Sequence, residues 1–125
     1  MHITRLDHLV LTVADIDASI RFYTQLGMEA ITFGAGRQAL TFGQQKINLH
    51  QVDKTFEPKA KCPTAGSADL CLIVEEALSE VIAQLRNMGI AIEEGPIERT
   101  GATGPILSVY VRDPDLNLIE LSQPL

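Results

Sequence analysis

Two halves of the sequence repeat one pattern, and this internal repeat restricts the possible folds more than any other feature. Residues 7–13 alternate in polarity and are rich in β-branched side chains, which predicts a strand, and residues 68–74 show the same pattern. An amphipathic helix is predicted after each of these strands. The first helix ends at Gly27 and the second at Gly89, since glycine suits the left-handed position that closes a helix.

Three further strands are predicted after each helix. They are 30–33, 38–42 and 46–52 in the first half, and 91–94, 108–112 and 117–122 in the second. Gly95–Pro96 is expected to end the strand before it, and Arg99 and Thr100 are expected in a glycine-rich loop. The sequence therefore predicts an α+β domain of two βαβββ modules, residues 1–53 and 67–125, with an exposed linker over residues 54–66. Each half is too small to cover its own sheet, so the halves should pack together or pair across a dimer.

Composition excludes several classes of partner. The net charge is −6, aromatic residues make up 5% of the chain, and there is no Trp. Nucleic acid and anionic membranes are therefore poor candidates, because both would be repelled and single-stranded bases would find few stacking platforms. Two cysteines are too few for a disulfide framework. The chain starts without the apolar segment of a signal peptide, so we expect a cytoplasmic protein.

Four polar side chains occupy matching places in the two halves. Strand periodicity puts His8 and Asp69 at corresponding positions of the first strands, and we take His50 and Glu120 as corresponding positions of the last strands. Two imidazoles and two carboxylates are the ligand types of a divalent first-row metal, and together they supply a charge of −2. Taken singly, a half-buried His is more often structural, and a Glu near the end of a chain is more often solvated. Their joint placement favours a metal site.

Three segments resemble a known superfamily: Asp7–Val13, Ile16–Gly27 and Arg112–Glu120, the last reading Arg-Asp-Pro-Asp-Leu-Asn-Leu-Ile-Glu. They are similar to the vicinal oxygen chelate superfamily, which includes glyoxalase I, fosfomycin-resistance enzymes, extradiol dioxygenases and bleomycin-binding proteins. Residues 99–120 are most similar to the branch of glyoxalase domain-containing protein 5. The resemblance implies a curved mixed sheet, or half-barrel, around a cleft that holds a divalent metal, usually in a homodimer.

The same resemblance assigns the metal ligands to His8, His50, Asp69 and Glu120, with Glu120 as the general base. His50 stands where glyoxalase I usually has Glu, and Asp69 where it usually has His, so the numbers of nitrogen and oxygen ligands are preserved. The metal would be Zn, Ni, Co, Mn or Fe.

The expected function is a glyoxalase-I-like isomerase or lyase that chelates neighbouring oxygens of a small substrate. It would stabilise an enediolate or alkoxide. The alternative is a non-catalytic protein that sequesters an antibiotic or metabolite in the same cleft, as bleomycin-binding proteins do. A third possibility is a scaffold that serves dimerisation alone.

Overall fold

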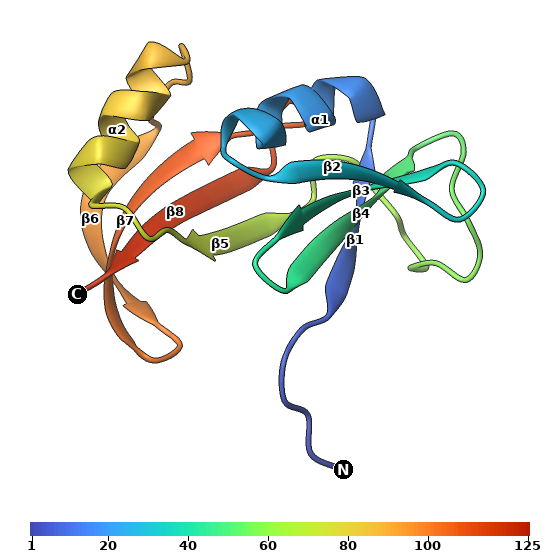
Figure 1. Cartoon of the computed structure of the whole chain (residues 1–125), viewed down its shortest axis with the longest axis horizontal. Helices are drawn as coiled ribbons and strands as arrows, with labels where there is room; N and C mark the ends of the chain where they lie inside the picture. The colour runs from blue at the N-terminus through green and yellow to red at the C-terminus, as the bar shows by residue number, and fades with distance from the viewer. The chain divides into compact units, whose positions relative to one another are not determined.

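Each half of the computed structural model, which describes residues 1–125, is a four-stranded mixed sheet with one helix (Figure 1). The chain divides into two units, Met1–Ser67 and Ala68–Leu125. Both units have the element order strand–helix–strand–strand–strand. The predicted α+β fold of two βαβββ modules is confirmed.

The first unit contains β1 (His8–Val13), α1 (Ile16–Gln25), β2 (Glu29–Phe33), β3 (Arg37–Phe42) and β4 (Gln45–Gln51). Its strands lie in the order β1-β4-β3-β2, with β1 parallel to β4 and the other pairs antiparallel. Asp15 begins the helix, because its carboxylate accepts a hydrogen bond from the backbone N–H of Asp17 at 3.0 Å. One face of the sheet supplies the core residues Leu11, Val13, Ile47 and Leu49, which are buried together with Tyr23 of α1.

The second unit contains β5 (Asp69–Ile73), α2 (Leu78–Asn87), β6 (Glu94–Gly101), β7 (Gly104–Arg112) and β8 (Leu118–Pro124). Its strand order, β5-β8-β7-β6, repeats that of the first unit, and β5 is parallel to β8. Leu78, Val81 and Leu85 form the buried stripe of α2. Neither α1 nor α2 is long and apolar enough to cross a membrane.

The strand β6 corrects the sequence-based prediction. It covers Glu94–Gly101, so the predicted strand 91–94 is wrong, and Arg99 and Thr100 lie in a strand paired with β7 instead of in a loop. A strand can pass through Gly95–Pro96 because β6 is an edge strand, where proline removes no interior hydrogen bond. The pairing with β7 shifts register between Glu94 and Ile97, which accommodates the irregular segment as a bulge.

The turn before β8 contains a left-handed residue that is not glycine. Leu116 has φ 67° and a side chain that is 68% exposed, so it bears the steric cost of this conformation without contributing to the core. We expect Leu116→Gly to stabilise the protein by about 0.5–1 kcal/mol, after the greater chain entropy of glycine is subtracted. Urea denaturation measures this gain. Leu116→Ala is the control, because it keeps Cβ and should give no such gain.

Candidate functional site

Glu120 lies on β8 between two neighbouring strands, opposite Cys71 of β5 and Tyr110 of β7. Its side chain is half-buried. The hydroxyl of Ser108 donates a hydrogen bond to Glu120 Oε2 at 2.6 Å, and the hydroxyl of Ser122 donates to the same oxygen at 3.3 Å. Both serines are fully buried, and their hydroxyl oxygens lie 2.7 Å apart. One carboxylate oxygen is therefore held in place by two buried hydroxyls.

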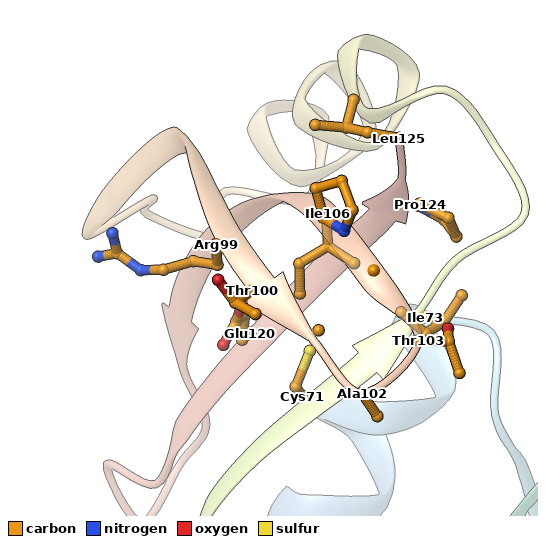
Figure 2. A pocket seen from close by; sticks show the side chains of 13 residues that line it. Cys71, Ile73, Arg99, Thr100, Ala102, Thr103, Ile106, Glu120, Pro124 and Leu125 are labelled. Atoms are coloured by element: carbon orange, nitrogen blue, oxygen red, sulfur yellow. The ribbon is translucent and has the colours of Figure 1, made fainter.

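A cavity of about 600 Å³ opens beside Glu120 within the second unit. Figure 2 shows Glu120 at the end of the cavity where Arg99 and Thr100 also lie. Apolar side chains, among them Ile106, Pro124 and Leu125, line the remainder. This combination of apolar walls and a few polar groups at one end is typical of small-molecule sites, and the volume suits a small organic ligand.

Asp69 and Glu120 line a second, smaller cavity of about 270 Å³. Two other carboxylates at its edge are paired with arginines: Glu93 with Arg112 at 2.8 Å and Glu94 with Arg99 at 3.5 Å. Asp69 and Glu120 form no ion pair. The structure thus brings the two predicted carboxylate ligands of the second unit to one cavity, where neither is part of an ion pair.

His8 lies at the start of β1 with a side chain that is 43% exposed. Its Nδ1 is 2.8 Å from Asp7 Oδ2, and this hydrogen bond lowers the pKa of Asp7. The contact orients the imidazole and leaves Nε2 free. Histidines that bind metal commonly have their other ring nitrogen on a carboxylate in this way.

The register of the strands corrects the predicted match between His50 and Glu120. In the second unit Glu120 pairs with Cys71, two residues after Asp69. In the first unit the residue two positions after His8 is Val10, and it pairs with Asn48. His50 pairs with Thr12 instead. His50 shares a sheet face with His8, but it lies beside Thr12, four residues along β1 from His8. At the rise of a strand, this separates the two histidines by about 13 Å.

His50 is also engaged by another side chain. Arg37 Nη2 lies 3.1 Å from His50 Nε2, and because a guanidinium can only donate, Nε2 accepts and the proton of the neutral ring is on Nδ1. The side chain of His50 is 2% exposed. Burial lowers the pKa of His50, and the positive charges of Arg37 and Lys59 lower it further. His50 is therefore a neutral, buried imidazole.

This lowered pKa predicts a pH-dependent stability. In the unfolded chain His50 takes up a proton near pH 6.5, while the folded protein resists protonation until lower pH. The stabilising contribution is thus complete above about pH 6.5 and is lost as the pH falls below it. Urea denaturation from about pH 7.5 to about pH 5 should show a smaller loss of unfolding free energy in His50→Gln than in the wild type. Parallel curves for the two proteins would contradict this.

Within neither unit does the structure gather three His, Cys, Asp or Glu side chains able to hold a metal ion. The predicted ligands are divided, with His8 and His50 in the first unit and Asp69 and Glu120 in the second. The four-ligand metal site stays a prediction. For His50 it would require Arg37 to release Nε2.

Comparison with known proteins gives consistent matches over the whole chain. Residues 5–121 match the family model of the Glyoxalase/Bleomycin resistance protein/Dioxygenase superfamily. Virulence protein STM3117 of Salmonella typhimurium is 60% identical over 124 residues, covering 98% of this chain and 86% of that protein. Glyoxalase domain-containing protein RDO1 of Mycosarcoma maydis is 57% identical, covering 98% and 69%. The crystal structure of STM3117 superposes with a TM-score of 0.99 at 59% identity and full coverage of both chains.

Proposed function

Since the chain belongs to the glyoxalase/bleomycin resistance protein/dioxygenase superfamily, we propose that it is a divalent-metal-dependent isomerase or lyase. Its substrate would be a small molecule with neighbouring oxygens, and it would act as a homodimer. Glu120 carries this proposal. It is a half-buried carboxylate that lines the 600 Å³ and the 270 Å³ cavities of the second unit, and one of its oxygens is held by Ser108 and Ser122.

Three of the predicted ligands fit a divalent metal. His8 offers a free Nε2 that is oriented by Asp7, and Asp69 and Glu120 are carboxylates that form no ion pair. A neutral imidazole with two carboxylates supplies a charge of −2 and suits Zn, Ni, Co, Mn or Fe. When bound, such an ion stabilises negative charge that develops on a substrate oxygen. We leave His50 out of this set, because its Nε2 is bonded to Arg37.

Proton transfer, positioning of the carboxylate and substrate binding would fall to different residues of the chain. Glu120 would act as the general base that accepts a proton from substrate carbon, and Ser108 and Ser122 contact only one of its two oxygens, Oε2. Ser108 and Ser122 are positioning residues that keep the carboxylate from rotating. The apolar walls formed by Ile106 and its neighbours would hold the substrate body and exclude water.

A second candidate function is sequestration of an antibiotic or metabolite without catalysis. The mainly apolar 600 Å³ cavity favours it. Glu120→Gln separates the two functions. A sequestering protein should keep its ligand affinity in this variant, whereas an enzyme should lose turnover.

The proposal is tested by measuring metal content, turnover and assembly. The purified protein should contain a divalent metal by emission spectroscopy. Metal-free protein should regain hemithioacetal isomerisation on addition of one of Zn, Ni, Co, Mn or Fe. Sedimentation should give the mass of a dimer. Tight metal binding without turnover would overturn the glyoxalase assignment alone, and absence of metal binding would overturn the whole proposal.

A further inference from the structure

The first unit carries a group of cationic side chains on one face of its sheet. Arg37 of β3 lies beside His50 of β4, since Gln38 pairs with Leu49 at the adjacent position, and the two side chains are hydrogen-bonded. Lys46, also on β4, shares this face with His50. We call Arg37, Lys46 and His50, with the rings of Phe33 and Phe56, the Arg37 cluster.

Two aromatic rings hold the cations of the Arg37 cluster. The Arg37 guanidinium carbon lies 5.1 Å from the centroid of the Phe33 ring and 4.8 Å from that of Phe56. Lys46 Nζ lies 3.9 Å from the Phe33 centroid, and the His50 ring packs edge-on against Phe56 at 5.3 Å. These contacts fix the guanidinium plane without neutralising its charge.

No carboxylate is ion-paired with these cations, and the one carboxylate that acts on Lys46 is the exposed Asp7, which is hydrogen-bonded to His8. Neither Arg37 nor Lys46 forms an ion pair, although the chain carries sixteen acidic residues and a net charge of −6. His50 is neutral, and the charges that act on it are the cations Arg37 and Lys59. The local potential is therefore positive in an otherwise acidic protein, which favours a small anion.

Two buried donors in the same cluster have no acceptor. Arg37 Nε and His50 Nδ1 are both inaccessible to solvent and form no hydrogen bond. Arg37 Nε carries a proton because a guanidinium is always protonated. His50 Nδ1 carries the proton of the neutral ring because Nε2 accepts from Arg37. Buried N–H groups in native proteins nearly always have a partner, and leaving one unpaired is costly. An incoming ligand oxygen would satisfy them.

We propose that the Arg37 cluster binds the carboxylate of a small organic acid. The planar guanidinium matches the two oxygens of a carboxylate, His50 Nδ1 supplies an additional donor, and Lys46 adds a second positive charge. Phe33 and Phe56 flank the guanidinium, so a ligand with a flat apolar body would contact their rings. This site lies entirely within the first unit and does not depend on the proposed metal chemistry.

The test is an NMR titration of metal-free protein with sodium benzoate and, separately, with inorganic phosphate. Benzoate should shift the Arg37 Nε–H and His50 ring signals and should bind more tightly than phosphate. Phosphate binding of equal or greater strength would overturn the assignment to a carboxylate. Absence of shifts with both anions, up to the solubility of the salts, would overturn the site itself.

Three variants decide whether the named residues form the site. Arg37→Lys keeps the charge but removes the Nε donor and the planar fork, and it should weaken benzoate binding about tenfold. Lys46→Gln, at a half-buried position, should weaken it several-fold and provides the test if Arg37→Lys fails to fold. Arg21→Gln removes an exposed, unpaired arginine of α1 and should bind as the wild type does. Equal affinity in the Arg37 and Lys46 variants and the wild type would overturn the proposal, while the metal-binding test would be unaffected.

Discussion

Replacing Glu120 with glutamine should abolish the stabilisation that a divalent metal gives to the protein. At a metal concentration 100 times its Kd, the wild type should gain about 2.7 kcal/mol in unfolding free energy. Glutamine keeps the shape of the side chain but loses the charge, and loss of a direct ligand should weaken metal binding about 100-fold or more. The variant would then gain no more than about 0.4 kcal/mol at the same concentration. Urea denaturation with and without metal measures both gains.

Matched variants identify the ligands in the same experiment. His8→Ala should lose the metal-induced gain, whereas His2→Ala, which changes an exposed histidine near the N-terminus, should keep it. Glu98→Gln is the control for Glu120→Gln, because Glu98 is an exposed carboxylate of β6 outside both cavities near Glu120. If Glu120→Gln and His8→Ala gained as much from metal as their controls, the proposed site would be wrong.

Gly95→Ala should destabilise the protein by about 3 kcal/mol, through two separate effects. Gly95 has φ 103°, a conformation that residues with Cβ rarely adopt. A Cβ at this position would also collide with the backbone carbonyl oxygen of Ser108 and lie 3.0 Å from Val109 Cα. Since Ser108 holds Glu120, the clash acts directly on the candidate site. The shift in urea midpoint, at unchanged m-value, measures the effect.

Gly27→Ala separates the cost of the backbone conformation from the cost of the clash with β7. Gly27 also has φ 103°, but no atom lies within 4 Å of where its Cβ would stand. It should therefore show only the cost of backbone conformation, about 1–2 kcal/mol. Equal losses in the two variants would mean that β7 yields to the added methyl group without cost.

The local features of this fold were determined by the sequence alone. Helices end before Gly27 and Gly89, and strands alternate between a core face and a polar face, because both patterns depend on residues close together in the chain. The repeat of these patterns was sufficient to predict two βαβββ modules.

The tertiary structure decided what depends on pairing between strands. A side-chain period of two cannot distinguish positions two residues apart, so only the register shows that Asn48, not His50, corresponds to Glu120. Gly95–Pro96 resembles a break, but the edge position and bulge of β6 keep it in the sheet. The contacts of Arg37 with His50 and of Ser108 with Glu120 join residues more than ten positions apart. Such contacts arise only when strands pair, and no pattern along the chain specifies them.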